Sequence, residues 1–267
     1  LISSSDQLTL ADDDWFIDPD NPSAFLTSSR DVKITASLSV GVSNNYGGTY
    51  AFAHGLDATA TGNNSHAQGS KVSATGGDSH AEGQGSQATA DAAHAEGGST
   101  RARGSGSHAE GQFSVATGSF SHAEGYLTIS SGAYSHAEGY KTTASAEGSH
   151  AEGLETSIES TATYAHAEGY LTIARGQSSH AEGAETLALG SLSHAEGRRT
   201  SASGDYSHAQ GRSTEAYGDY SFAAGYETQA SGAYSFAIGR STTSSGDYSF
   251  AAGQLTSASG QFSFAIG

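Results

Sequence analysis

Alanine and glycine recur at fixed positions every fourteen residues over most of the chain. Alanine stands at sixteen positions from Ala53 to Ala265; histidine or phenylalanine precedes each one, and glycine follows two residues later. We call that histidine or phenylalanine the marker of its repeat. The markers are Phe52, His66, His80, His94, His108, His122, His136, His150, His166, His180, His194, His208, Phe222, Phe236, Phe250 and Phe264. Successive markers keep this fourteen-residue spacing except for His150 and His166, which are two residues further apart. This period predicts repeats that pack against their neighbours.

Each repeat contains two short segments that alternate as strands do. In the first, Ser-His-Ala-Glu at 79–82, serine and alanine fall on one face and histidine and glutamate on the other. In the second, the sixth and eighth positions after the marker hold small residues such as Thr128 and Ser130, while the fifth, seventh and ninth vary and are often polar. We expect the small residues and the alanine to meet inside a thin coil. Two recurrent glycines per repeat, such as Gly125 and Gly132, predict corners that need positive φ or close backbone approach.

These patterns predict an all-β protein, a parallel β-roll or β-solenoid of 14-residue coils. Sixteen coils should occupy residues 51–267 and form a rod roughly 75 Å long, at about 4.8 Å per coil. The two extra residues near 154–165 should bulge outward without breaking the stack. Residues 1–50 contain the only tryptophan and both prolines. We expect them to form a cap or connector with a β-strand near 31–43.

The outward face of the first strand varies little from copy to copy. The coil needs this face for no packing of its own, so the uniform chemistry of the face predicts contact between subunits. The expected interface residues are His80, Glu82, His108, Glu110, His122, Glu124, His136, Glu138, His180, Glu182, His194, Glu196, Phe222, Phe236, Ile238, Phe250, Phe264 and Ile266.

Composition narrows the expected function. With 36 glycines and only 35% hydrophobic residues, the chain can fill a narrow core of stacked small residues but not a conventional one. Its formal net charge of −17 argues against nucleic acids and anionic membrane surfaces as partners. No run of about 18 apolar residues occurs, so we expect no membrane insertion by this chain. The absence of cysteine excludes disulfides and thiolate chemistry.

The histidines and glutamates invite two chemical interpretations. A serine–histidine–carboxylate triad is not expected, because Ser79 and His80 are adjacent in a strand and point to opposite faces. We therefore expect no catalytic residues, no cofactor and no enzyme activity. Histidine and carboxylate suit zinc or nickel, which leaves a metal- or ligand-binding solenoid as the alternative function. Its candidate ligands are His80, His94, His108, His122 and His136. Hydrogen bonding between neighbouring chains is a simpler use of these pairs, so we expect no bound metal.

Two further rows of side chains have plain structural interpretations. Threonines such as Thr128, Thr142 and Thr228 form a file that could suggest ice binding, but the alternation places it inside the coil. Tyrosines such as Tyr134 and Tyr220 fall at coil corners, where sugar binding competes with packing between stacked rings. We expect packing.

The repeat resembles the head repeats of YadA-like trimeric autotransporter adhesins, which have a similar period and a Ser-Val-Ala-Ile-Gly core. The resemblance spans Phe52 to Gly267 and is greatest at Ser-Phe-Ala-Ile-Gly, residues 235–239 and 263–267. It implies a left-handed parallel β-roll assembled as a homotrimer. The central copies depart from the family by placing histidine and glutamate where aliphatic residues are usual. Their Ser-His-Ala-Glu-Gly core is similar to repeats of phage tail and tail-fibre proteins.

The resemblance implies a structural or adhesive fibre, either a surface adhesin head or a phage tail-fibre shaft. Its expected partners are two further copies of itself and an unidentified host-surface or matrix receptor. Its expected location is extracellular, on a cell surface or a virion tail. Because the chain starts at Leu1 and ends in mid-repeat, we expect it to be part of a longer protein. Pairing of histidine with glutamate across chains would raise the pKa of histidines such as His80.

Overall fold

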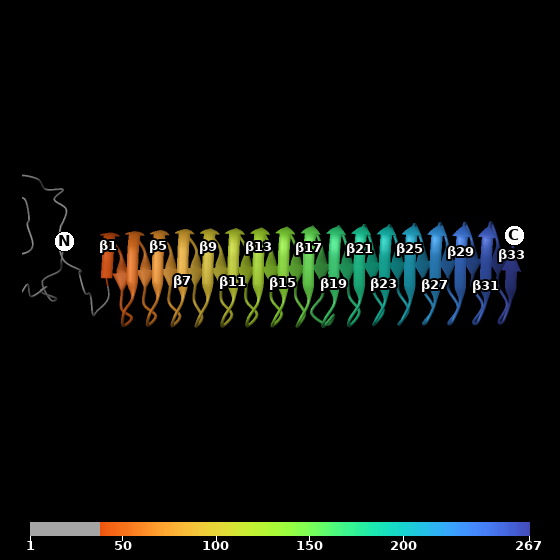
Figure 1. The fold of residues 1–267 in the computed structure, drawn as a ribbon, viewed down its shortest axis with the longest axis horizontal. Coiled ribbons are helices and arrows are strands. Elements are labelled where there is room, and N and C mark those ends of the chain that lie inside the picture. Colours follow the sequence, from red (N-terminus) through yellow and green to blue (C-terminus); the bar gives the residue numbers. More distant parts are fainter. Residues whose placement is uncertain (1–37) are drawn as a thin grey trace, which may run out of the picture. The chain divides into compact units, whose positions relative to one another are not determined.

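The computed structural model describes residues 38–267, which form one continuous stack of parallel β coils (Figure 1). Each coil contributes a longer strand to one sheet and a two-residue strand to a second sheet, and the sheets contain 17 and 16 strands. The longer strands are β1 (Leu38–Val42), β3 (Phe52–Leu56), β5 (His66–Ser70), β7 (His80–Gln84), β9 (His94–Gly98), β11 (His108–Gln112), β13 (His122–Tyr126), β15 (His136–Tyr140), β17 (His150–Leu154), β19 (His166–Tyr170), β21 (His180–Ala184), β23 (His194–Arg198), β25 (His208–Arg212), β27 (Phe222–Tyr226), β29 (Phe236–Arg240), β31 (Phe250–Gln254) and β33 (Phe264–Ile266).

The shorter strands lie between the longer ones in the chain and stack in a parallel sheet of their own. They are β2 (Asn45–Tyr46), β4 (Thr59–Ala60), β6 (Ser73–Ala74), β8 (Gln87–Ala88), β10 (Arg101–Ala102), β12 (Val115–Ala116), β14 (Ile129–Ser130), β16 (Thr143–Ala144), β18 (Ser157–Ile158), β20 (Ile173–Ala174), β22 (Leu187–Ala188), β24 (Ser201–Ala202), β26 (Glu215–Ala216), β28 (Gln229–Ala230), β30 (Thr243–Ser244) and β32 (Ser257–Ala258).

Corresponding residues of successive coils lie side by side. In β7 and β9, for example, His80 pairs with His94 and Glu82 pairs with Glu96. The predicted all-β parallel solenoid of 14-residue coils is confirmed. No helix long and apolar enough to cross a membrane occurs among residues 38–267.

The stack begins before the first marker. Strand β1 pairs in parallel with β3, so that Leu38 lies beside Phe52 and Gly41 beside Gly55. Strand β2 pairs with β4 in the same way. Residues 38–50, which we expected in the cap or connector, therefore form an additional coil. The rest of the expected cap, including the start of its strand near 31–43, lies outside the described residues.

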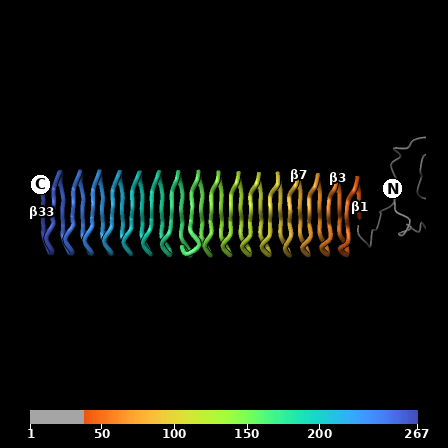
Figure 2. Tube along the Cα trace, turned by 180° about the vertical axis from the view of Figure 1, so that it is seen from behind, coloured from red at the N-terminus to blue at the C-terminus, as the bar shows by residue number. Residues whose placement is uncertain are grey.

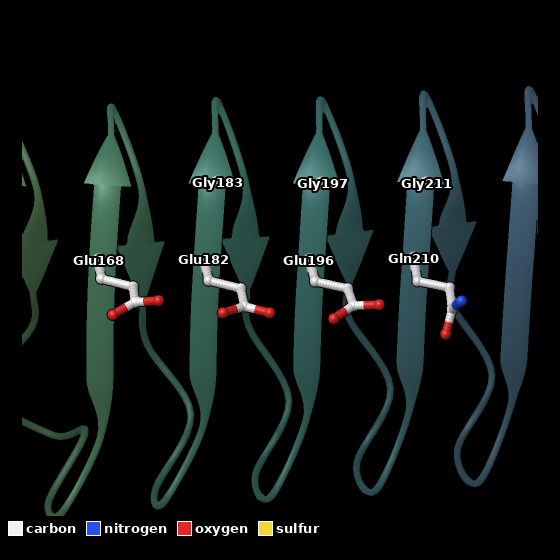
Figure 3. Close-up of a pocket in the computed structure, with 7 residues that line it drawn as sticks. All are labelled: Glu168, Glu182, Gly183, Glu196, Gly197, Gln210 and Gly211. Carbon is white, nitrogen blue, oxygen red and sulfur yellow. The ribbon is translucent and has the colours of Figure 1, made fainter.

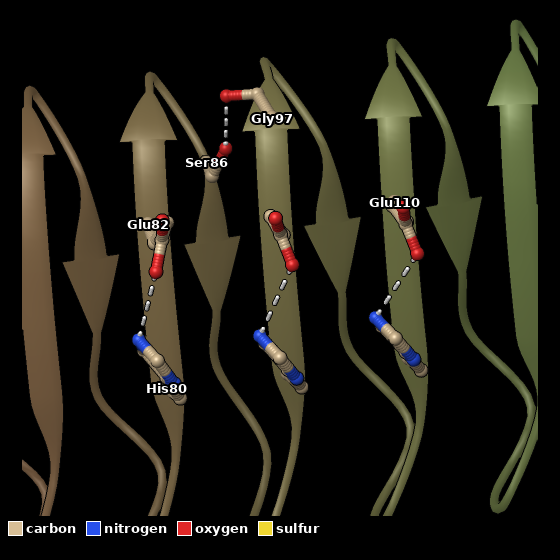
Figure 4. Close-up of polar contacts among 8 residues, drawn as sticks. His80, Glu82, Ser86, Gly97 and Glu110 are labelled. Carbon is tan, nitrogen blue, oxygen red and sulfur yellow. Dashed lines mark hydrogen bonds and ion pairs between the residues drawn. The ribbon is translucent and has the colours of Figure 1, made fainter.

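The core is a narrow column of small side chains. Alanines directly after the marker, such as Ala81, and eight positions after it, such as Ala88, are fully buried. Thr128 and Thr228 lie on the same inner side and are also buried. The predicted inward face of both strands is confirmed, and the burial of the threonine file removes the basis for ice binding. Some inner hydroxyls bond to the backbone, as where Ser86 donates to the carbonyl of Gly97 at 2.9 Å (Figure 4).

The two extra residues between His150 and His166 are absorbed in one turn. Strand β17 pairs with β19 in the common register, with His150 beside His166, and β18 pairs with both β16 and β20. The wider turn is visible in green in Figure 2. Ile158 replaces the small residue of other coils and is one of the two largest fully buried side chains, with Val72. The prediction that the insertion leaves the stack unbroken is confirmed.

The close backbone approach expected at the recurrent glycines is confirmed, but most left-handed residues of the turns are not glycine. The left-handed turns lie two residues before and five after the marker, mostly at other residues, such as Tyr134 (φ 58°) and Leu127 (φ 56°). Gly125 also has positive φ, 116°, but it lies within β13. Gly132, ten positions after its marker, is not among the positive-φ residues. A methyl group on either glycine would overlap the backbone of the next coil, so both require close approach, and Gly125 requires a positive φ as well.

Candidate functional site

The outward side chains of the longer strands form what we call the marker face. It consists of the markers and the residues two positions after them, which are mostly histidine and glutamate in the central coils. The strand alternation that buries Ala81 turns His80 and Glu82 outward, where both side chains remain partly exposed. Ser79 instead points inward and donates to the carbonyl of Gly76 at 2.7 Å. Serine and histidine of the same coil are thus on opposite sides of the strand.

The marker rings are stacked along the whole face. Consecutive imidazoles from His66 to His208 have centroids 4.6–4.9 Å apart, and their planes are nearly parallel as far as His194. Phenylalanine continues the file at both ends: Phe52 lies 4.9 Å from His66, and Phe222 lies 5.2 Å from His208. The markers therefore form one aromatic file, with an imidazole section in the middle and a phenyl section at the C-terminal end.

In most of the histidine coils, glutamate lies beside the imidazole without hydrogen bonding to it. In seven coils the histidine Nε2 and the glutamate Oε2 of the same strand are 3.4–4.0 Å apart (Figure 4). Contact also crosses between coils, since His194 Nε2 lies 3.7 Å from Glu182 Oε1. Hydrogen bonds between nitrogen and a carboxylate are shorter, about 2.7–2.9 Å.

A shallow groove open to solvent runs along the carboxylates near the C-terminal end of the imidazole section. Figure 3 shows Glu168, Glu182, Glu196 and Gln210 projecting from successive strands in the same orientation. Glycines of the same strands, Gly183, Gly197 and Gly211, complete its lining. The groove is thus lined by acidic and amide side chains and by exposed backbone.

Within one chain, several of the stacked histidines have a lowered pKa. Burial lowers the pKa of His80 below its usual 6.5, and the neighbouring imidazoles of His66 and His94 lower it further. Glu82 and Glu96 oppose this shift but do not reverse it. Burial is also the largest cause of a lowered pKa at His66, His108, His136, His166 and His208. The rise in histidine pKa was predicted for pairs formed across chains and stays a prediction; within one chain, burial and the stacked neighbouring imidazoles lower the pKa of these histidines.

Acid should destabilise the metal-free protein. A histidine with a lowered pKa in the folded state binds protons more readily when the chain unfolds. Its contribution to stability is therefore complete above about pH 6.5 and is lost as the pH falls below that value. We expect the melting temperature in the presence of a chelator to be constant above about pH 7 and to fall steadily below pH 6.5.

A variant with fewer imidazoles provides the control for this pH dependence. Replacing His108, His122 and His136 by phenylalanine keeps the ring file and should make the acid-induced decrease smaller. A melting temperature that peaks in mildly acidic solution would contradict the prediction and would favour histidine–glutamate pairs between chains.

Tyrosine ladders lie in the turn before the marker and at the last position of the longer strands. Tyr206, Tyr220, Tyr234, Tyr248 and Phe262 stack with centroids 4.8–5.2 Å apart. Tyr126 and Tyr140 form a shorter stack at 5.1 Å. Their ring faces cover one another and leave mainly the edges exposed, so the predicted packing role is confirmed.

Comparison with known families decides where this architecture belongs. The sequence model described as the YadA head domain repeat, in two copies, matches residues 53–79, 102–121, 167–193 and, in overlapping segments, 202–267. Together these matches cover more than half of the chain. The chain belongs to the YadA head repeat family. No curated protein matches it.

YadA head repeats form structural fibres of the adhesin type. This assignment places the chain among structural and adhesive proteins rather than enzymes, and it indicates surface exposure. The match is continuous over 202–267, where the markers change from histidine to phenylalanine and isoleucine appears at 238 and 266. The match also covers histidine–glutamate coils at 102–121 and 167–193.

The expected interface residues all lie on the marker face of this YadA head repeat. Ile238 is 40% exposed there, and Phe236 is half-buried between Phe222 and Phe250. The common register gives His94, Glu96, His150, Glu152, His166 and Glu168 the same position, although they were absent from the expected set. The regular spacing of these residues from the neighbouring markers in the sequence already predicted that they share this position.

Proposed function

We propose that the chain is a section of an adhesive or structural fibre that assembles as a homotrimer through the marker face. The observation that supports this most directly is the C-terminal section, where Ile238 and the file from Phe222 to Phe264 present apolar groups to solvent. A contiguous apolar surface of this kind is typical of a subunit contact. The known trimeric state of YadA head domains gives the number of chains, and the family likewise suggests a left-handed coil.

The mass in solution tests this assembly. Three chains of 27.0 kDa should elute as one species of about 81 kDa in size-exclusion chromatography with light scattering. The measurement should be made over a range of protein concentrations at neutral pH. A stable species with the mass of a single chain at all of them would contradict the trimer.

The fibre should act outside the cell, either as a surface adhesin head or as a phage tail-fibre shaft. YadA head domains bind host surfaces, and the acidic chain, with net charge −17, is poorly suited to nucleic acids. Its partner would be a host-surface or matrix receptor. The flanking sequence of the intact gene separates the two contexts, because an adhesin carries a membrane anchor and a tail fibre carries a virion attachment domain.

Receptor binding can be measured directly. Labelled protein should bind saturably to host cells or matrix-coated surfaces if it is an adhesin, and to bacterial cells if it is a tail fibre. An excess of unlabelled protein should compete in either case. Failure to bind any of these surfaces would remove the adhesive part of the proposal and leave a structural shaft.

A further inference from the structure

Carboxylates occur on the marker face only where imidazoles surround them. Nine consecutive coils carry both residues, and their glutamates are Glu82, Glu96, Glu110, Glu124, Glu138, Glu152, Glu168, Glu182 and Glu196. The imidazole file extends one coil further at each end, to His66 and His208, and there glutamine stands in place of glutamate, at Gln68 and Gln210. Each glutamate therefore has an imidazole in its own coil and in both adjacent coils. This distribution links the carboxylates to the imidazoles rather than to the general surface charge.

The imidazole nitrogens that face the carboxylates lack hydrogen-bond partners. Nε2 of all eleven marker histidines is shielded from solvent and makes no hydrogen bond within residues 38–267. The carboxylate oxygens lie 3.4–4.0 Å away in seven of the same coils. A buried nitrogen without a partner is costly, and this one is close to an anionic oxygen but too far to bond to it.

The carboxylates also repel one another. Register places each of them directly beside the next along the sheet, as with Glu110, Glu124 and Glu138, and like charges in this arrangement are destabilising. Lysine and arginine occupy neither the marker position nor the second position after it in any of the sixteen repeats. A cation bound between an imidazole and a carboxylate would give the nitrogen a partner and would also reduce the repulsion between the carboxylates.

We propose that the nine histidine–glutamate coils bind divalent transition-metal ions, each held by one marker imidazole and by carboxylates of its own and an adjacent coil. Two ligand atoms about 2.1 Å from a tetrahedral zinc ion lie about 3.4 Å apart. The measured separations of 3.4 Å at His150 and Glu152 and 3.5 Å at His80 and Glu82 match this value closely. Imidazole nitrogen favours zinc, nickel or copper over calcium and magnesium, which prefer oxygen ligands.

The stacking of the rings determines which ligands an ion can share. Imidazole planes such as those of His94 and His108 are within 1° of parallel, so their in-plane lone pairs run side by side and do not converge on one ion. One imidazole with two carboxylates avoids this conflict. Several clusters along the face have ligand atoms within 4.8 Å of one another; most combine two imidazoles with one carboxylate, as His94, Glu96 and His108 do, whereas Glu168, His180 and Glu182 have the favoured composition. All ligands come from a single chain, so the site does not depend on the proposed trimer.

Zinc titration of the full chain tests the proposal. The protein is stripped with a chelator, dialysed and titrated with zinc chloride in a calorimeter at pH 7.5, with calcium chloride as the comparison ion. We expect several zinc ions per chain, a higher melting temperature with zinc and no comparable binding of calcium.

Two triple variants remove ligands, and each introduces the residue type that other coils of this chain have at the same position. The triple variant Glu110→Gln, Glu124→Gln and Glu138→Gln copies the end coils, and His108→Phe, His122→Phe and His136→Phe copies the phenylalanine coils. Each affects three of the nine histidine–glutamate coils and should remove about a third of the bound zinc, with an unchanged circular dichroism spectrum.

A charge-matched control separates specific sites from general attraction to an acidic protein. Glu147→Gln, Glu215→Gln and Glu227→Gln remove the same charge outside the marker face and should leave zinc binding unchanged. The proposal is overturned if zinc does not bind, or if the control loses as much zinc as the two ligand variants. Equal binding of calcium and zinc with no effect of the histidine substitutions would also overturn it.

Discussion

Replacing Gly125 by alanine should strongly disrupt the stack. Gly125 has a φ of 116°, which L-residues rarely adopt, and an added Cβ would overlap the carbonyl oxygen of Gly139 in the next coil. That oxygen belongs to the backbone of β15, so it cannot move without breaking the register of the two strands. We expect a destabilisation of more than about 4 kcal/mol, since backbone strain and overlap act together.

The measurement should report the stability of individual coils, because long repeat arrays do not always unfold as one unit. Hydrogen exchange should accelerate in β11, β13 and β15 before it does elsewhere. Gly98→Ala provides the control, since Gly98 has no positive φ and its Cβ would meet only Gln112 Cγ at 3.5 Å. Equal stability of the two variants would show that the coils can separate to accept a side chain at position 125.

Truncating Phe236 to alanine should cost roughly 3–5 kcal/mol per chain and dissociate the proposed trimer. In one chain the ring is stacked between Phe222 and Phe250, at 4.6 and 5.2 Å, with its outer side facing solvent. Assembly through the marker face would bury that outer side against the partner chains. Urea unfolding at fixed protein concentration, together with light scattering, measures both effects.

Tyr234→Ala is the matched control for Phe236→Ala. Tyr234 is in the same coil, stacks between Tyr220 and Tyr248 at similar distances and is 49% exposed at the corner. Its truncation should cost about 1 kcal/mol and leave the mass unchanged. A cost below about 1 kcal/mol for Phe236→Ala, or one equal to that of Tyr234→Ala, would show that Phe236 faces solvent in the assembled protein.

The period and the alternation within each repeat were sufficient to predict the solenoid and the direction of most side chains. Thr128 and Ala81 point inward, and His80 points outward, because the strand period of two leaves no other arrangement once one face must be buried. The first coil was not predicted, because Ser39 stands where the repeats have alanine. Its signal was nonetheless available, since Gly41 and Gly48 have the spacing of the two recurrent glycines.

Properties that arise from closure of the coil were harder to predict. Tyr134 adopts a left-handed conformation because the turn requires it, and its ring then stacks on Phe120 at 5.5 Å. The direction of the histidine pKa shift has a similar origin. The period placed His66 and His94 beside His80, but the burial that contributes most to lowering the pKa of His80 depends on how closely the rings stack, which only the structure shows.

The uniform register has a consequence for how such a gene can vary. Every coil meets nearly identical strands on either side, so recombination that deletes or duplicates one 14-residue unit leaves each remaining coil with equivalent neighbours. The fibre can therefore change length in increments of about 4.8 Å while its fold stays the same. Small insertions need not be eliminated either, since the turn after β18 holds two additional residues without disturbing the pairing of β17 and β19. The length of the fibre can thus evolve separately from the chemistry of the individual coils.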